Sequence, residues 1–508
     1  MHYKKKTIIL IIIASLVRCI IAGTIELGND EVYYRMYAQY LQWNYFDHPP
    51  MVGWLIRIST VNLFFDTEFF IRFAAIVSAA ITTWLFYLSG KKLHSDHTGF
   101  IAAAIYTATI YGSIIAGTFI LPDAPQMVCW SAGLYLLIHI TRSDAINKIK
   151  KGKLLLFGLV CGVGMLCKIH TSFLWFGFLL YIVLYNRKWL KQPSLYYAAL
   201  ITLLLFYPVI QWNIDNHFIT YRFHSSRVNI SGSGLDLNSF VAFFAGQVFY
   251  YNPVLFIFII IATIAAFKNR LPVVLSQQRL LLCCSLPLII LATAIALFKN
   301  VLPHWTGPAY SGLILLTAVY FAQRSQKKQL PTPVLLANIL LAVIMIAGIT
   351  SIHFLPGTLG KKEKDNFGEG DFTLDLYGWK DIKRSVENIV AADIKNGLMK
   401  ADAVIICNKW FPAAHTDFYI ALPLQKDLVA IGDTTDIHQY AWINTQRKKL
   451  QAGDDAYCIV SSNYNLDVKN IYSSYFSNIS PPQIVEQKRN GSLCRNFYIW
   501  RLKNYIAK

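Results

Sequence analysis

Charged residues are scarce in this sequence of 508 residues: they make up 15% of the chain, whereas hydrophobic residues make up 55%. Soluble domains carry about 25% charged residues, so the deficit indicates that a bilayer surrounds much of the chain. The sequence also lacks a G-x-G-x-x-G motif after a strand, a Walker loop and an H-E-x-x-H motif. Its 12 histidines show no zinc-like spacing, and it contains no internal repeat.

The nine cysteines lack C-x-x-C spacing. Six lie in apolar runs, where they behave as small hydrophobic residues: Cys19, Cys129, Cys161, Cys167, Cys283 and Cys284. The polar tail holds Cys407, Cys458 and Cys494. A disulfide between two of these three stays open, and the sequence does not select the pair.

The formal net charge of +19 comes from short basic clusters that separate apolar runs. This arrangement is typical of membrane topology and not of a nucleic-acid groove, so we expect no nucleic-acid partner. The first apolar run, residues 7–23, contains Arg18 and lacks a convincing small-x-small cleavage site. We therefore expect a retained first helix and not a signal peptide.

A membrane-spanning helix needs roughly 20 apolar residues. On this scale the sequence predicts about eleven spans, at residues 7–23, 69–90, 99–120, 124–141, 154–168, 171–186, 195–211, 252–267, 280–298, 307–322 and 334–355. Every alternate loop carries a basic cluster, at residues 4–6, 91–92, 148–153, 187–191, 268–279 and 324–328. The positive-inside rule then predicts a multi-pass membrane protein with a cytoplasmic N-terminus and the tail outside.

The predicted domains follow from this topology. Residues 1–355 form the membrane domain, with long outside loops at 24–68 and 212–251. The apolar stretch 51–65 carries Arg57 and is short, so we expect it to lie along the membrane interface. Residues 356–508 form a small α/β extracytoplasmic domain, since β-like runs at 403–407, 428–431, 457–460 and 497–502 alternate with helical stretches.

Ionisable residues gather on the outside loops and at the outside ends of the predicted helices. Such groups are costly to desolvate, so they pair, bind ligands or face water. For each one alone, a solvated loop charge is the simpler interpretation, but their grouping favours a site. The group comprises Asp30, Glu31, Asp47, His48, Asp123, Lys168, His170, Arg222, His224, Arg227 and His304.

Prolines fix two of the carboxylates. Pro49-Pro50 restricts the turn that carries Asp47 and His48, and prolines flank Asp123 at a helix break. A carboxylate can act as a general base on an acceptor hydroxyl, while cations hold a phosphate leaving group. Asp123 could instead be the N-cap of the next helix. Lys168 ends an apolar helix, where it either has an anionic partner or extends to the interface.

These motifs together resemble a known family. They are Asp30-Glu31, Tyr45-Phe46-Asp47-His48-Pro49-Pro50, Asp123-Ala124-Pro125, Trp212-Asn213 with Arg222 and Arg227, His304-Trp305, and tail segments at 375–379 and 440–442. Their order is similar to that of the GT-C membrane glycosyltransferases of the RgtA/B/C/D-like class. That class is similar to ArnT, the lipid A aminoarabinose transferase, and more distantly to protein O-mannosyltransferases. The resemblance spans most of residues 1–320.

The resemblance implies an enzyme that transfers a sugar, with inversion, from a polyprenyl-phosphate carrier to lipid A or lipopolysaccharide, another glycan or a protein. It implies Asp30 as the base or as the group that orients the acceptor, and Asp123 as the second catalytic carboxylate. Substrate-binding residues would be Glu31, Tyr34, Asp47, His48, Lys168, His170, Arg222, Arg227 and His304. ArnT-like enzymes tend to carry Lys where this chain has His48, so Lys168, Arg222 or Arg227 would supply the fixed positive charge.

We assign no metal ligands, although some relatives use a divalent cation and Asp30-Glu31 could hold one. Two other functions stay open: a transporter or flippase of lipid-linked substrates, and a non-catalytic protein of envelope assembly. Few charges lie in mid-span and the two halves show no symmetry, which disfavours a transporter. The sequence does not identify the sugar or the acceptor.

Overall fold

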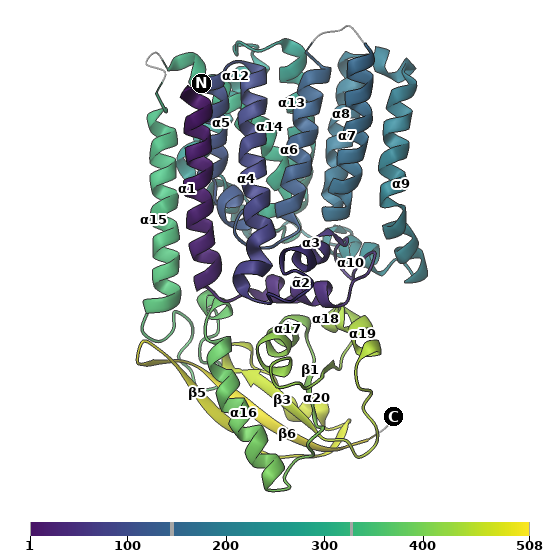
Figure 1. The fold of residues 1–508 in the computed structure, drawn as a ribbon, viewed down its shortest axis with the longest axis vertical. Helices are drawn as coiled ribbons and strands as arrows, with labels where there is room; N and C mark the ends of the chain where they lie inside the picture. The colour runs from purple at the N-terminus through teal and green to yellow at the C-terminus, as the bar shows by residue number, and fades with distance from the viewer. Residues whose placement is uncertain (1, 143–146, 326–328, 507–508) are drawn as a thin grey trace. The chain divides into compact units, whose positions relative to one another are not determined.

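The computed structural model describes residues 2–142, 147–325 and 329–506, which form two compact units (Figure 1). The first unit comprises residues 1–23 and 41–344, and the second comprises residues 24–40 and 345–508. This division differs from the predicted domains at both boundaries. Residues 24–40, expected in an outside loop of the membrane domain, belong to the second unit, and the later boundary falls inside a helix, before residue 355.

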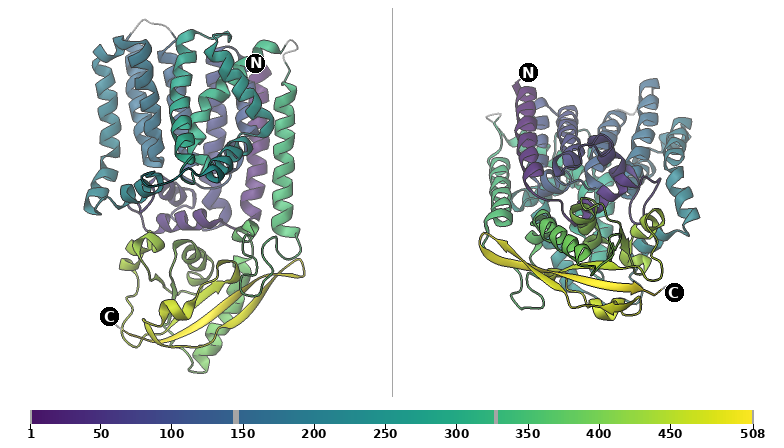
Figure 2. Two further views of the ribbon diagram at one scale, coloured as in Figure 1. Left: turned by 180° about the vertical axis from the view of Figure 1, so that it is seen from behind. Right: turned by 60° about the horizontal axis from the view of Figure 1, so that its bottom comes forward.

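The first unit is helical, and its long helices run alongside one another in both views (Figures 1 and 2). Its α-helices are α1 (His2–Thr24), α3 (Met51–Ser59), α4 (Glu68–Leu93), α5 (Asp96–Ala108), α6 (Asp123–Ile140), α7 (Lys148–Cys167), α8 (Ser172–Tyr185), α9 (Pro193–Asp215), α10 (Ile219–Val228), α11 (Leu237–Tyr250), α12 (Pro253–Phe267), α13 (Leu275–Ala296), α14 (Tyr310–Arg324) and α15 (Thr332–Phe354), the last of which continues into the second unit. Short helices are the π-helix η1 (Tyr111–Ile115) and the 3₁₀ helices η2 (Ile169–Thr171), η3 (Arg187–Lys191) and η4 (Pro303–Ala309).

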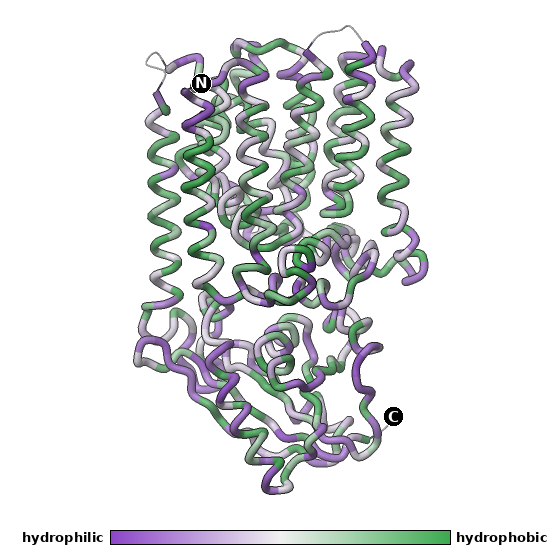
Figure 3. The backbone as a smooth tube through the Cα atoms, viewed as in Figure 1, coloured by the Kyte–Doolittle hydropathy of each residue, from purple (hydrophilic) through white to green (hydrophobic). Residues whose placement is uncertain are grey.

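Each of the predicted spans coincides with a helix or with a pair of helical segments. Among the described residues, five helices are long and apolar enough to cross a membrane: α1, α4, α9, α13 and α15. The pair α11 and α12, bent by 97°, would make a sixth. Figure 3 shows hydrophobic residues along these helices and hydrophilic residues at their ends. The chain is thus a multi-pass membrane protein, while the count of eleven is not confirmed.

The predicted span 99–120 is not one continuous helix. It breaks after Ala108 and continues as the π-helix η1. Arg18, which is 1% exposed, donates hydrogen bonds to the Gly112 carbonyl (3.4 Å) and to Ser113 Oγ (3.2 Å), and the Ser113 hydroxyl donates to the Thr107 carbonyl (2.5 Å). Side chains thus satisfy carbonyls that a continuous helix would bond internally, which allows the break inside a buried region.

The second unit is a small α/β domain. Its helices are α2 (Asn29–Gln39), η5 (Phe372–Leu376), α16 (Trp379–Lys395), α17 (Trp410–Thr416), η6 (Asp417–Ala421), α18 (Thr434–Ile437), α19 (Tyr440–Ile443), η7 (Asn444–Gln446), η8 (Ser462–Tyr464) and α20 (Val468–Tyr472). Its strands are β1 (Val404–Cys407), β2 (Leu428–Ala430), β3 (Ala456–Ser461), β4 (Phe476–Ile479), β5 (Gln483–Arg489) and β6 (Ser492–Tyr505).

The strand order is β2-β1-β3-β6-β4, with β5 also paired to β6. β1 lies parallel to β2 and β3, whereas β6 is antiparallel to β3, β4 and β5. The four predicted β-like runs are confirmed as β1, β2, β3 and β6. The predictions missed β4 and β5, because β5 is rich in polar residues and β4 has only four residues, so neither has a clear apolar pattern. All nine cysteines are free thiols, so the disulfide left open for the tail is not present.

Residues 24–40 join the second unit through hydrogen bonds to its helices. The Glu26 carboxylate accepts bonds from the backbone N–H groups of Trp379 (2.7 Å) and Lys380 (3.1 Å), at the start of α16. The first N–H groups of a helix have no internal partner and carry partial positive charge, so a carboxylate there is favourable. Gly378, at φ 78°, supplies the left-handed turn that precedes α16. The cap of this helix therefore comes from a residue 353 positions earlier.

Arg447 connects this segment to the sheet, because it bonds to Tyr40 and to the Leu428 carbonyl of β2, and it also forms a buried ion pair. Arg447 Nη2 lies 2.6 Å from Asp417 Oδ2, with the side chains 3% and 1% exposed. Arg447 Nε also donates to the Tyr40 hydroxyl at 3.0 Å.

We expect Arg447→Met to lower the free energy of unfolding by about 3–5 kcal/mol, because it leaves the Asp417 carboxylate buried without its cation. The neighbouring Lys448 provides the control, since its pair with Asp402 is partly exposed, at 32% and 67%. Lys448→Met should change stability by less than about 1 kcal/mol. Thermal unfolding of the purified protein measures both changes. Equal melting temperatures for the two variants would show that Arg447 does not stabilise the buried Asp417 carboxylate.

Candidate active site

The centre of the candidate site in the first unit is a buried ion pair. Lys168 Nζ lies 2.7 Å from Asp123 Oδ2, and the two side chains are 4% and 2% exposed. Asp123 is the first residue of α6, where the helix dipole favours a carboxylate, and Lys168 follows the last residue of α7. Lys168 therefore has an anionic partner and does not extend to the interface. Asp123 is not an N-cap, because Pro122 occupies that position.

The second oxygen of the carboxylate is also bonded. The Tyr111 hydroxyl, from η1, donates to Asp123 Oδ1 at 3.0 Å. Gly307, in η4, leaves room for this ring, because a Cβ there would lie 2.0 Å from Cζ of Tyr111. The Tyr251 hydroxyl donates to the Gly307 carbonyl at 3.2 Å and so holds η4 in place. Sequence reasoning missed Tyr111 and Tyr251, since both lie in aromatic-rich apolar stretches without a motif.

Four histidines surround the ion pair: His48, His170, His224 and His304. Burial, the Lys168 ammonium and the other three histidines hold the pKa of His48 well below its usual 6.5. Burial and Lys168 likewise lower the pKa of His304 to about 4, although Asp123 opposes the shift. These two imidazoles are consequently neutral at pH 7 and can donate hydrogen bonds without adding charge.

His224 and His170 differ in their hydrogen-bond partners. His224 Nε2 lies 2.7 Å from the backbone carbonyl of Asp47, so this nitrogen carries the proton and donates. Asp47 therefore contributes its main chain to the arrangement. His170 Nδ1 is buried and has no hydrogen-bond partner among the described residues. A buried polar atom without a partner is costly, which favours a ligand or water at this position.

Arg227 lies near this cluster and interacts electrostatically with His224 and His304. Its guanidinium carbon lies 5.1 Å from the centre of the Trp305 ring, and the His170 ring lies 5.9 Å from the same indole. Arg222 is exposed and donates to the His217 carbonyl, and no contact in the described part of the chain connects it to the cluster. The structure thus brings together His48, Asp123, Lys168, His170, Arg227 and His304 of the predicted residues.

Asp30, Glu31 and Tyr34 belong to the second unit, in helix α2. Asp30 is exposed in the first turn. Glu31 Oε2 accepts a hydrogen bond from the Gly28 N–H at 3.0 Å and thereby stabilises the start of α2. Tyr34 is 3% exposed and packs against Tyr37, with ring centres 5.4 Å apart.

Within residues 2–142, 147–325 and 329–506, no group of three or more His, Cys, Asp or Glu side chains is arranged to hold a metal ion. The divalent cation at Asp30-Glu31 stays an untested prediction.

Comparisons with known proteins agree with this architecture. The family described as dolichyl-phosphate-mannose-protein mannosyltransferase matches residues 47–212. The lipid A galacturonosyltransferase RgtD of Rhizobium johnstonii is 22% identical over 288 residues, which is 56% of this chain and 59% of that protein. The undecaprenyl phosphate-α-4-amino-4-deoxy-L-arabinose arabinosyl transferase of Pseudomonas aeruginosa is 28% identical over 210 residues, 39% of this chain and 35% of that protein. The match to each relative therefore covers less than two thirds of its length.

A solved structure extends the likeness to the whole fold. The crystal structure of ArnT from Cupriavidus metallidurans bound to undecaprenyl phosphate superposes with a TM-score of 0.60. The superposition covers 97% of each chain at 14% sequence identity. Both units of this chain thus have counterparts in that fold.

The ion pair yields a stability prediction. Lys168→Met should lower the free energy of unfolding by about 3–5 kcal/mol, because Asp123 then stays buried without a cation. Adding Asp123→Asn removes the unpaired charge, so the double variant should be more stable than Lys168→Met alone. Melting temperatures of the single and double variants, in detergent, test the coupling, and strictly additive effects would show that the two side chains do not interact.

The lowered pKa of His304 predicts a pH dependence. The unfolded chain binds this proton near pH 6.5 and the folded protein near pH 4, so stability falls as the pH drops between these values. At pH 5 the loss should be on the order of 1–2 kcal/mol relative to pH 7. His304→Gln should flatten the melting-temperature profile between pH 7 and 5, whereas His2→Gln, at an exposed position of α1, should leave it unchanged. Identical profiles for the wild type and the two variants would refute the lowered pKa of His304.

Proposed function

We propose that this chain is a membrane glycosyltransferase of the GT-C class and transfers a sugar from a polyprenyl-phosphate carrier to an acceptor of the cell envelope. The observation that carries the proposal is the buried Asp123–Lys168 pair with Arg227 and four histidines around it. Such a site combines one fixed cation beyond the ion pair with several neutral N–H donors. That is the environment a phosphate leaving group requires.

The charges of the site support binding of the donor phosphate. Asp123 balances the charge of Lys168. Burial and the Lys168 ammonium keep His304 neutral at pH 7, so the buried region carries little net charge. An entering phosphate shares Lys168 with Asp123 and accepts hydrogen bonds from Arg227 and the imidazoles. Its negative charge also raises the pKa of nearby histidines. These histidines can then take up a proton as the bond between the sugar and the phosphate breaks.

The acceptor requires a base. Both oxygens of Asp123 are bonded to Tyr111 and Lys168, which disfavours Asp123 as the base. We assign this role to Asp30, the exposed carboxylate of the Asp30-Glu31 motif in the first turn of α2. In the reaction the acceptor O–H proton passes to Asp30 and the acceptor oxygen bonds to the anomeric carbon. The bond from that carbon to the phosphate oxygen breaks, and the phosphate keeps the electron pair. Attack opposite the leaving group inverts the configuration of the sugar carbon. Asp123 acts as a positioning residue for Lys168.

We further propose that the acceptor is lipid A or a related envelope glycan, which is supported by the likeness to RgtD, a lipid A galacturonosyltransferase. The undecaprenyl phosphate bound in the ArnT structure supports a carrier of the same chemistry. The basic loops favour a bacterial inner membrane with the N-terminus in the cytoplasm, which places the second unit and the reaction outside.

Asp30→Asn in the purified full chain should reduce sugar transfer from a polyprenyl-phosphate donor to lipid A by at least about 100-fold, since the variant lacks a general base. Asp381 is the matched control, because it is another exposed carboxylate in the first turn of a helix of the same unit. Asp381→Asn should keep full activity. Unchanged transfer by Asp30→Asn, at an unchanged melting temperature, would exclude Asp30 as the base.

A further inference from the structure

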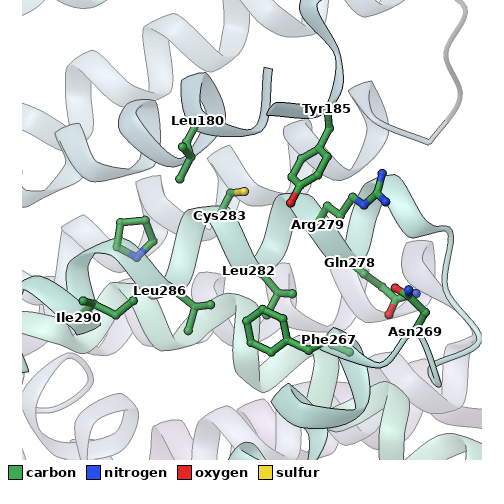
Figure 4. A pocket seen from close by; sticks show the side chains of 12 residues that line it. Leu180, Tyr185, Phe267, Asn269, Gln278, Arg279, Leu282, Cys283, Leu286 and Ile290 are labelled. Atoms are coloured by element: carbon green, nitrogen blue, oxygen red, sulfur yellow. The ribbon is translucent and has the colours of Figure 1, made fainter. Parts of the chain in front are cut away.

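A groove distinct from the candidate active site lies on the first unit, between the end of α8, the end of α12 and residues 278–290 of α13. Its volume is about 400 Å³. Figure 4 shows Tyr185 and Arg279 near one end of this groove and Leu286 and Ile290 near the other. Because this face combines a polar end with an apolar length, it is suited to an amphipathic molecule.

The apolar part of the groove opens on the outer surface of the helices. Arg279, Cys283, Leu286 and Ile290 recur every three or four residues along α13 and so line one face of it. Ile290 is 62% exposed and Phe267, from α12, is 60% exposed. From Arg279 to Ile290 the helix rises about 16 Å. That length is close to half of the roughly 30 Å hydrocarbon core, which is the depth of one leaflet.

The polar end is basic. Residues 268–279 contain Lys268, Arg270 and Arg279 and no acidic residue. The Arg279 guanidinium lies 4.5 Å from the centre of the Tyr185 ring, and no carboxylate pairs with it within the described ranges of the chain. An arginine stacked on a ring keeps its N–H groups available in the guanidinium plane, where they can bind a phosphate with two parallel hydrogen bonds.

A second polar group that lines the groove is the side-chain amide of Gln278. Gln278 is 3% exposed, and its Nε2 donates to the carbonyls of Leu271 (3.4 Å) and Val273 (2.8 Å). Because carbonyl oxygens only accept, these bonds fix the orientation of the amide. Gln278 Oε1 is then a buried acceptor without a hydrogen-bond partner in the described structure. A ligand group that donates a hydrogen bond would satisfy this acceptor.

We propose that this groove binds a bilayer phospholipid whose headgroup joins a phosphodiester to a free hydroxyl, as in phosphatidylglycerol. The phosphodiester accepts hydrogen bonds from Arg279, a headgroup hydroxyl donates to Gln278 Oε1, and an acyl chain lies along Leu286 and Ile290. A choline headgroup has no donor for Gln278. An ethanolamine headgroup would bring an ammonium next to Arg279. The groove lies at the end of the helices that bears the basic loops, so with the orientation proposed above the lipid belongs to the cytoplasmic leaflet.

Native mass spectrometry of the purified full chain tests this binding with phosphatidylglycerol and phosphatidylcholine of identical acyl chains. The wild type should retain phosphatidylglycerol about tenfold better, and Arg279→Gln should remove that preference. Arg324→Gln is the matched control, because the Arg324 guanidinium also lies over a tyrosine ring, that of Tyr320 at 3.7 Å, but does not line the groove. This variant should behave as wild type.

Two further measurements separate the groove from a general attraction to anionic lipid. Leu286→Trp should fill the groove and reduce retention about tenfold without removing a charge. Phosphatidylmethanol, which lacks the headgroup hydroxyl, should bind several-fold more weakly than phosphatidylglycerol. Melting temperatures confirm that each variant is folded. Equal retention of the lipids by the wild type, equal effects of Arg279→Gln and Arg324→Gln, or one-for-one displacement by polyprenyl phosphate would each overturn the proposal.

Discussion

The ion pair between Asp123 and Lys168 is the constraint on which the candidate site depends. Removing two charges from water is costly. Their attraction offsets this cost only when the geometry is good and the remaining lone pairs and N–H groups of the two side chains are hydrogen-bonded. Here the dipole of α6 and a hydrogen bond from the Tyr111 hydroxyl also stabilise the Asp123 carboxylate. The pair in turn requires that α7 ends beside the start of α6, that α5 gives way to η1, and that Gly307 leaves space for the Tyr111 ring.

The same pair sets the electrostatics of its surroundings. Burial and the Lys168 ammonium lower the pKa of His48 and His304 and keep both imidazoles neutral at pH 7, so the site can place several histidines together without mutual repulsion. This arrangement accounts for a histidine and not a lysine at position 48. A second ammonium next to Lys168 would be repelled, whereas a neutral imidazole is not. The charge of an incoming phosphate removes the effect, since it favours protonation of the same groups. Binding and proton uptake are thereby coupled in the proposed reaction.

Sequence reasoning succeeded where a signal is local and repeated. The apolar runs predicted a helix or paired helical segments at every proposed span, and four short apolar runs predicted β1, β2, β3 and β6. It missed β4 and β5, which are polar, and it did not anticipate that residues 24–40 group with the second unit. That segment belongs to the second unit because Glu26 caps α16 and Tyr40 contacts Arg447, and no local pattern announces contacts across more than 300 residues.

The sequence by itself determined that this is a multi-pass membrane protein with a small α/β tail, because hydropathy and charge depend on composition along the chain and not on its folding. It also supplied the residue types of the site, through short motifs that resemble a family. Only the tertiary structure decided that Lys168 pairs with Asp123, that Tyr111 completes the carboxylate, and that Arg222 lies apart from the cluster. Those outcomes depend on how helices distant in sequence pack, and packing positions side chains to within a few tenths of an ångström, which no one-dimensional pattern specifies.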